Sequence, residues 1–213
     1  MTRLQPFVFL ALLAALSWAQ DKNQAAPASP RPASRANSVS GAGAISEGVY
    51  RNPSFGFSYK LPYGWVDRTR EMQDDSPDAP NNASKSLLLV AIFERPPEAA
   101  TSETVNSAVV IAAEPLSSYS GMKTAADYFG PLTELATAKG FQAVEQPRQF
   151  SIGYRQLLRG DFTKPRGTNT VLQTSLVMLE RGYEVSFTFI GGSQDEISEL
   201  IEKLSFGAKK TAH

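Results

Sequence analysis

The clearest alternation of apolar and polar positions lies between residues 55 and 61. Large apolar side chains occupy every second position there, and small or polar residues stand between them: Phe55, Phe57, Tyr59 and Leu61. A period of two is typical of a strand with one buried face. Proline, serine and glycine precede it, and a Pro-x-Gly sequence ends it, so residues 50–65 predict a strand, a tight turn and a second strand. Trp65 follows at the edge of the expected core.

Two further segments are apolar without alternation. Residues 86–93 and 107–114 are continuous apolar runs, and prolines follow both of them. Runs of this length are typical of central strands whose two faces are both covered. We therefore expect other elements to lie on both faces of the sheet.

Two segments have the spacing of amphipathic helices. Residues 122–139 place apolar side chains three or four positions apart, and Gly130-Pro131 interrupts them, which predicts a bend or two short helices. Residues 193–204 form a second helical pattern, with Ser193 and Glu196 at the spacing of a capping box. Its apolar stripe consists of Ile197, Leu200, Ile201 and Leu204.

Three antiparallel strands are predicted between the helices, over residues 152–162, 170–180 and 183–190. Their connections are residues 163–169 and the tight pair Arg181-Gly182. The order of strands, helix, three strands and helix predicts an α+β sandwich. We expect an antiparallel sheet of about six strands, covered by helices.

The opening segment also resembles a known family. Its aromatic, glycine and proline positions resemble the start of PsbP/Mog1/DUF1795-like sandwich domains: Tyr50, Asn52, Phe55, Gly56, Phe57, Ser58, Pro62, Gly64 and Trp65. The resemblance implies such a domain over residues 49–206. PsbP-like members are extrinsic subunits of membrane complexes, and Mog1-like members bind a small GTPase. Neither partner is carried over to this chain, because members of one fold differ in function.

Both ends differ in composition from this domain. Residues 1–19 combine Arg3, an apolar run of ten residues and the sequence Ser17-Trp18-Ala19, which predicts a secretory signal peptide. An uncleaved anchor is the alternative. Residues 20–48 are rich in proline, alanine and serine and predict a disordered linker, and residues 207–213 predict a flexible tail. We therefore expect an exported protein, periplasmic or extracellular, with no transmembrane segment after cleavage of the signal peptide.

Composition excludes several kinds of chemistry. The 213 residues contain no cysteine, so a lipoprotein anchor, thiol catalysis and zinc–thiolate sites are excluded. The single histidine, His213, is the last residue, which leaves none for a catalytic triad. There are 21 basic and 21 acidic residues, and this balance gives no basis for binding nucleic acid. We expect no cofactor and no metal.

Three carboxylates remain as candidates for acid–base chemistry: Glu114, Asp161 and Glu180. The sequence does not place any two of them together. Gly191-Gly192 could hold an anion at a helix N-terminus, although a plain strand-to-helix turn is favoured. The acidic segment 66–84 could bind Ca²⁺, although a solvated loop is favoured because the spacing of an EF-hand is absent.

Basic residues gather in the three-strand segment. They could form a patch that docks an acidic partner or an anionic surface: Arg155, Arg159, Lys164, Arg166 and Arg181. The alternative is charge that protects strand edges from aggregation, which the sequence favours. Tyr50, Tyr63 and Trp65 could likewise form a recognition site, but a role in closing the core is favoured.

These observations predict an exported, non-catalytic interaction or accessory module of an envelope or membrane-associated complex. Its partner is an unidentified protein. The alternative is a carrier that binds a small apolar ligand between sheet and helices, and its basis is the aromatic content of 10% and the apolar strands. A hydrolase built on carboxylates is a third hypothesis, and we do not expect an enzyme.

Overall fold

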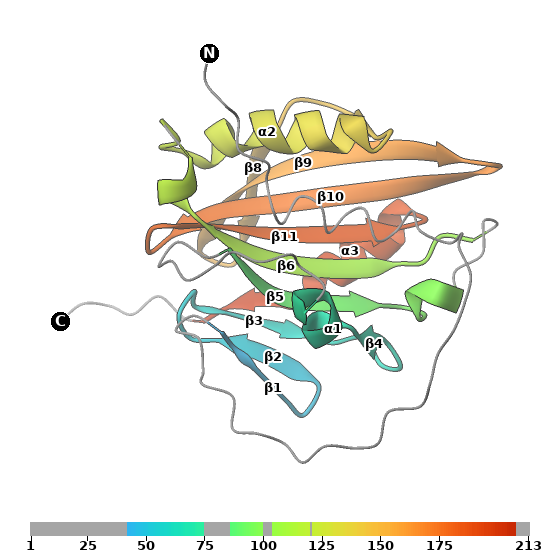
Figure 1. The fold of residues 1–213 in the computed structure, drawn as a ribbon, viewed down its shortest axis with the longest axis horizontal. Helices are drawn as coiled ribbons and strands as arrows, with labels where there is room; N and C mark the ends of the chain where they lie inside the picture. Colours follow the sequence, from blue (N-terminus) through green and yellow to red (C-terminus); the bar gives the residue numbers. More distant parts are fainter. Residues whose placement is uncertain (1–41, 75–85, 100–103, 120, 208–213) are drawn as a thin grey trace.

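The computed structural model describes residues 42–74, 86–99, 104–119 and 121–207. The predicted signal peptide, most of the predicted linker and part of the acidic segment lie outside the described residues. The fold has three layers (Figure 1). A large sheet forms the middle layer, a small sheet and one helix cover one face, and two helices lie on the other.

The large sheet contains eight strands, and every pairing between them is antiparallel. Its order is β4 (Val66–Asp67), β5 (Leu87–Phe93), β6 (Ala108–Pro115), β11 (Tyr183–Gly191), β10 (Asn169–Glu180), β9 (Arg155–Arg166) and β7 (Gln142–Ala143). An eighth strand, β8 (Arg148–Ile152), pairs with β9. The two apolar runs of the sequence are therefore central strands, as predicted.

The small sheet contains strands from both the beginning and the end of the described chain. Its order is β1 (Ala44–Ser46), β2 (Val49–Asn52), β3 (Phe57–Lys60) and β12 (Leu204–Phe206). β1 lies inside the segment that the sequence assigned to the linker, because its pairing with β2 orders residues that have no apolar pattern. β12 was predicted as the end of a helix, but Leu204 leaves the helix and pairs with Tyr59.

The helices are few and short. α1 (Thr69–Asp74) lies against β5, α2 (Ala125–Ala138) lies over β9 and β10, and α3 (Gln194–Glu202) packs on the opposite face of the large sheet. Two 3₁₀ turns, η2 (Pro97–Ala99) and η3 (Leu116–Ser118), complete the described elements. The prediction of an α+β sandwich is confirmed, but the described chain has twelve strands in two sheets instead of about six.

The first core fills the space between the two sheets. The alternating residues of β11 point into it, and Phe187 meets the ring of Phe57 edge to face at a centroid distance of 4.9 Å. α3 adds its apolar stripe at Ile197, Leu200 and Ile201. Each large apolar side chain buried here contributes about 1.5–3 kcal/mol by removal from water. Residues 183–190 thus form a strand, as predicted, and Trp65 packs against this core as a half-buried residue.

The second core lies under α2, on the other face of the large sheet. Tyr128, Phe129, Leu132 and Ala136 descend from one side of the helix onto the strands. Phe129 rests on Gly160 of β9, where any added Cβ would collide with the ring. A glycine in the middle of a strand here lets an aromatic ring lie close to the backbone.

α2 is one helix of fourteen residues, although the sequence predicted a bend or two pieces at Gly130-Pro131. Thr124 caps its start: the Thr124 hydroxyl accepts from the Asp127 N–H, and the Asp127 carboxylate accepts from the Thr124 N–H. This capping box and the buried face of the helix offset the hydrogen bond that Pro131 removes.

The β9–β10 hairpin is longer than the sequence predicted. Pairing continues to Arg166 and Asn169, so the connection is only Gly167-Thr168 and the predicted turn 163–169 is mostly strand. β8 and β9 form a second hairpin, which occupies the start of the single strand predicted from residue 152. The tight turn at Arg181-Gly182 is confirmed, and both residues have positive φ.

Candidate functional site

The five basic residues of the predicted patch lie in three different places. Arg155 and Arg159 share the face of β9 that points toward the small sheet, as does Leu157. Lys164 and Arg166 are on the opposite face of the same strand, with Leu158 and Phe162. Arg181 lies in the β10–β11 turn, at the other end of these strands. The strand register thus separates residues that are close in sequence.

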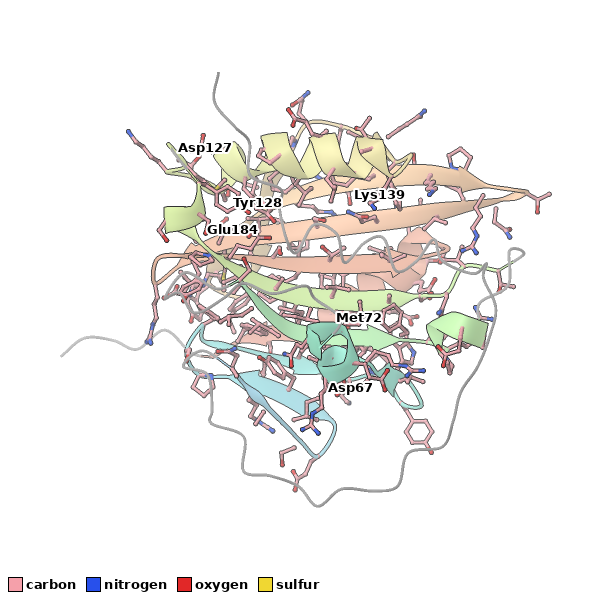
Figure 2. All side chains as sticks on the ribbon, in the orientation of Figure 1. Asp67, Met72, Asp127, Tyr128, Lys139 and Glu184 are labelled. Atoms are coloured by element: carbon pink, nitrogen blue, oxygen red, sulfur yellow. The ribbon has the colours of Figure 1, made fainter. Side chains whose placement is uncertain are left out.

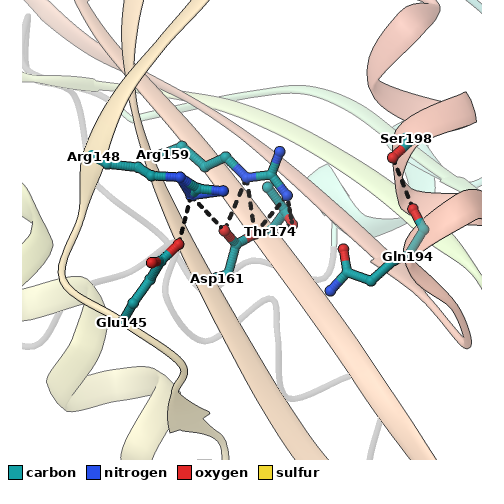
Figure 3. Close-up of polar contacts among 7 residues, drawn as sticks. All are labelled: Glu145, Arg148, Arg159, Asp161, Thr174, Gln194 and Ser198. Atoms are coloured by element: carbon teal, nitrogen blue, oxygen red, sulfur yellow. Dashed lines mark hydrogen bonds and ion pairs between the residues drawn. The ribbon is translucent and has the colours of Figure 1, made fainter.

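Arg159 belongs to a closed ion-pair cluster with Asp161 (Figure 3). The Arg159 Nε donates to both carboxylate oxygens of Asp161, at 3.0 and 2.9 Å. Arg148 of β8 reaches the same carboxylate at 3.0 Å and pairs with Glu145 at 2.9 Å, while the Thr174 hydroxyl of β10 donates to Asp161 at 2.5 Å. The cluster joins three strands, and the charge of Arg159 is balanced within the fold.

Arg155 is also paired. Its Nη2 lies 2.6 Å from Oε2 of Glu180, and its guanidinium sits over the ring of Phe206 at 5.6 Å from the centroid. Arg181 lies near the same carboxylate, at 3.9 Å, but two thirds of its side chain is exposed. The candidate carboxylates Asp161 and Glu180 therefore each bind arginine, on separate parts of the β9–β10 hairpin.

Lys164 and Arg166 belong to the part of the hairpin that extends past its neighbours. β11 ends where Gly191 pairs with Leu172, and β7 ends where Gln142 pairs with Thr163. Residues 164–171 beyond these points are termed the hairpin arm. Figure 1 shows the arm at the right of the view, beyond the end of β11.

The hairpin arm is basic. Lys164 lies beside Gly140, with its ammonium 5.6 Å from the centroid of the Phe141 ring. A second lysine, Lys139, lies at the end of α2, directly before Gly140 and Phe141, and is labelled in Figure 2. No aspartate or glutamate occurs between residues 162 and 179. The tip itself, residues 167–170, is exposed.

Glu114, the third candidate carboxylate, meets a glutamate that the sequence analysis did not select. Glu114 of β6 and Glu184 of β11 are direct cross-strand partners, and both side chains point toward α2. Their exposed fractions are 3% and 0%. Figure 2 shows Tyr128 of α2 close to Glu184. The Tyr128 hydroxyl donates to Oε1 of Glu114 over 3.4 Å.

Burial changes the acid–base behaviour of this carboxylate pair. Burial raises the pKa of Glu114 to about 7. Burial, together with the negative charge of Glu114, raises the pKa of Glu184 well above its ordinary value. Burial also raises the pKa of Tyr128. Desolvation disfavours the charged form of each of these acids, so the pair retains protons at pH values where exposed glutamates are ionised.

The possible anion site at Gly191-Gly192 is filled by the protein itself. Glu196 of α3 folds back, and its Oε2 accepts from the Gly192 N–H at 2.8 Å while Oε1 accepts from the Ser107 hydroxyl. The Ser193 hydroxyl caps the helix by accepting from the Glu196 N–H. A carboxylate of the chain thus takes the place that an external anion would occupy.

The aromatic residues near the opening turn do not form one surface. Tyr50 is buried, and its hydroxyl accepts from the Asn52 side chain and from the Gly43 N–H, both at 3.0 Å. Tyr63 is fully exposed, whereas Trp65 packs on the first core. These placements favour the core role for Tyr50 and Trp65.

A small pocket lies at the start of α2. Its volume is about 240 Å³, and its walls come from residues 124–126, Gln149, residues 156–158 and residues 177–179. Pockets for drug-sized ligands usually enclose roughly 300–1,000 Å³. The pocket is therefore of a size for a small molecule or fragment.

Metal-ligand clusters and membrane-spanning helices were assessed for residues 42–74, 86–99, 104–119 and 121–207. Within these ranges no three histidine, cysteine, aspartate or glutamate side chains come together as metal ligands. No helix in the same ranges is long and apolar enough to cross a membrane.

Comparisons with known proteins find similarity at the level of solved structures. No family model matches the sequence, and no curated protein matches it. The structure is similar to PsbP (CyanoP) from Synechocystis, with a TM-score of 0.46 and 12% identity over 75% of this chain and 91% of that protein. It is also similar to the Ran-binding protein Mog1p of Saccharomyces cerevisiae, with a TM-score of 0.40 and 10% identity over 71% of this chain and 90% of that one.

A third similar structure is LpqN, which is described as involved in cell envelope biogenesis of Mycobacterium tuberculosis. Its TM-score is 0.36, at 12% identity over 71% of this chain and 83% of that one. PsbP and Mog1p are the two proteins named by the resemblance of the opening segment, and both are among the similar folds. The likeness concerns the fold.

Proposed function

We propose that this protein is an exported, non-catalytic interaction module that docks an acidic partner protein through its hairpin arm. It would act as an accessory part of an envelope or membrane-associated complex. The observation that carries the proposal is the arm itself. Residues 164–171 extend past β7 and β11, and they carry Lys164 and Arg166 in a segment whose sequence contains no aspartate or glutamate.

Electrostatics support an acidic partner. The ion pairs of Arg155 and Arg159 balance their charges inside the fold, whereas the half-buried Lys164 lies over the Phe141 ring and takes part in none of the ion pairs found among the described residues. A basic projection attracts an acidic surface at long range and fixes its orientation. The exposed residues 167–170 add small and polar groups at the tip.

The N-terminal sequence supports export. Residues 1–19 have the charge and apolar pattern of a signal peptide, and residues 20–41 are rich in proline, alanine and serine. A segment of that composition acts as a spacer between a domain and the surface that it serves.

The buried carboxylate pair supports a role without catalysis. Glu114 and Glu184 are 3% and 0% exposed, so a substrate in solution does not contact them. The carrier of a small apolar ligand remains the second candidate. The pocket at the start of α2 favours it only for a small ligand, because its volume is about 240 Å³.

The test is a pull-down from the cell envelope with the wild-type protein and the double variant Lys164→Glu/Arg166→Glu, at low and moderate salt. We expect the wild type to recover a specific partner that is lost as salt rises, because salt screens exposed charges. The arm variant should lose that partner at both salt concentrations. Its thermal midpoint should stay close to that of the wild type, which separates docking from folding.

The matched control is Arg51→Glu/Lys60→Glu, which makes the same change in net charge on exposed residues of the small sheet. We expect this variant to retain the partner. Loss of the partner in both variants would assign binding to overall charge, and retention in the arm variant would reject the hairpin arm as the docking site.

A further inference from the structure

Among the described residues, the Glu114–Glu184 pair is unusual because it has no positive partner. All ion pairs of the described residues involve other carboxylates, and the two glutamates face each other across β6 and β11. Within the described chain, neither carboxylate oxygen of Glu184 lies within hydrogen-bonding geometry of a donor, although the Tyr128 hydroxyl is near enough to oppose part of the rise in the pKa of Glu184. An ionised carboxylate in such a position costs several kcal/mol relative to water.

The elements packed around the pair supply few polar groups. α2 contributes the Tyr128 hydroxyl, which also interacts with the buried hydroxyl of Ser186 on β11, and the ring of Tyr119 covers Tyr128 edge to face at 6.1 Å. β10 places apolar Leu179 opposite Glu184. Asp127, the next charged group on α2, is exposed, and its carboxylate accepts from the N–H groups of Lys123 and Thr124.

The site has too few hydrogen-bond donors for two ionised carboxylates. The Tyr128 hydroxyl can donate to one carboxylate oxygen, and in the structure that oxygen belongs to Glu114. Two ionised glutamates present four oxygens that only accept hydrogen bonds. A proton on one carboxyl group supplies the missing donor and removes the repulsion between two like charges.

We propose that Glu114, Glu184 and Tyr128 form a proton-binding site that holds the N-terminal half of α2 against the large sheet and releases it when the proton leaves. The bound ligand is a proton, shared within the pair. The site depends on cross-strand pairing and on the burial of both carboxyl groups, and it is independent of the hairpin arm.

The shifted pKa values agree with this geometry and give the sign of the effect. The pKa of Glu114 is raised to about 7 and the pKa of Glu184 is raised well above its ordinary value, so the folded protein binds protons more tightly than the unfolded chain does. Stability is therefore highest below the ordinary pKa of a glutamate. It falls as the pH rises through the folded-state pKa values.

The test is chemical unfolding of the full chain between pH 5 and pH 8, for the wild type, Glu184→Gln and Glu114→Gln. Glutamine has the shape of a protonated glutamate. We expect the folding equilibrium constant of the wild type to fall by about tenfold per pH unit below pH 7 for each proton lost. Each variant should show a shallower pH dependence and greater stability than the wild type at pH 8. Glu199→Gln, on the exposed side of α3, should behave as the wild type does.

A second measurement uses only the wild type. Carbon-13 NMR of the glutamate carboxyl groups should show two that titrate well above the pH range of exposed glutamates, one of them near pH 7. The absence of such groups would overturn the proposal, as would equal pH dependence in wild type and Glu184→Gln. Recovery of stability at pH 8 on adding Ca²⁺ or Mg²⁺, lost in Glu184→Gln, would also overturn it by assigning the pair to a metal ion.

Discussion

Gly160 lets α2 approach the large sheet closely, because the ring of Phe129 occupies the space where a Cβ would stand. We expect Gly160→Ala to destabilise the domain by about 1–3 kcal/mol, since overfilling a packed core forces side chains or backbone to shift. Urea unfolding at fixed pH measures this loss. The double variant Gly160→Ala/Phe129→Leu should recover part of it, because the two positions are in direct contact.

Gly130 provides the matched control on the same helix. A Cβ there meets nothing within 4 Å, and the residue is exposed in the middle of α2. Gly130→Ala should change the stability of the domain by less than about 1 kcal/mol, because the gain in helix propensity is offset by the contact of the new Cβ with the ring of Pro131. Equal effects at the two glycines would contradict the close packing of Phe129 on β9.

Single residues of the candidate site were only partly predictable. Glu114 was selected from the sequence, because a carboxylate at the end of an apolar strand stands out. Glu184 was not selected, since it alternates with Val185 and its neighbours in the pattern of a solvated face. Burial of that face depends on α2 and on strand order, which the residues of β11 do not encode. A glutamate between Tyr183 and Val185, in a strand rich in apolar residues, is the signal that could have identified it.

The β8, β9 and β10 strands are joined by the carboxylate of Asp161. Replacing it in Asp161→Asn leaves Arg159, whose side chain is only 12% exposed, without its negative partner. We expect a loss of about 2–3 kcal/mol in the free energy of unfolding, because a charged hydrogen-bonded group is left nearly buried and unpaired. Thermal and urea unfolding would measure it.

Glu180→Gln is the control for this prediction. Its pair with Arg155 is about a quarter exposed on each side, so solvent screens it. We expect a cost below about 1 kcal/mol. If the two variants cost the same, burial of the Asp161 cluster would not be the source of its stability.

Helices and strands with a strong apolar pattern were predictable from the sequence, and those with a weak pattern were not. The helices and the three long strands follow from apolar spacing, as β11 shows. β8 was missed because residues 148–152 are mostly polar and exposed, and only pairing with β9 makes them a strand. A bend or two short helices were expected for residues 122–139, but α2 is one helix. Packing of Leu132 and its neighbours against the sheet overrides the tendency of Pro131 to break the helix.

One strand of the small sheet lies before residue 49, the predicted start of the domain. β1 pairs with β2, and the Gly43 N–H donates to the Tyr50 hydroxyl. A chain that begins at Val49 should therefore be less stable than one that begins at Ala42, by about 1 kcal/mol, which lowers the melting temperature by about 2–4 °C. Calorimetry of the two shortened chains measures the difference. Equal melting temperatures would show that β1 adds nothing to stability.

The overall architecture was predictable as a class but not in its layers. The order of elements indicated a sandwich, and the resemblance of the opening segment indicated which kind. The division into two sheets was not visible, because it depends on the pairing of Phe57 with Phe206 across most of the chain. Contacts of such sequence separation leave no local pattern in the residues that make them.

The pairing of β3 with β12 also determines when the domain can be completed during synthesis. β12 follows every other described element in the chain, so a growing chain cannot close the small sheet until residues 204–206 have been synthesised. Until then β3 lacks one of its two neighbours, and the aromatic side chains of the first core lack part of their cover. A polypeptide in that incomplete state can still be threaded through a translocation channel, so late closure of the small sheet is compatible with the export proposed above.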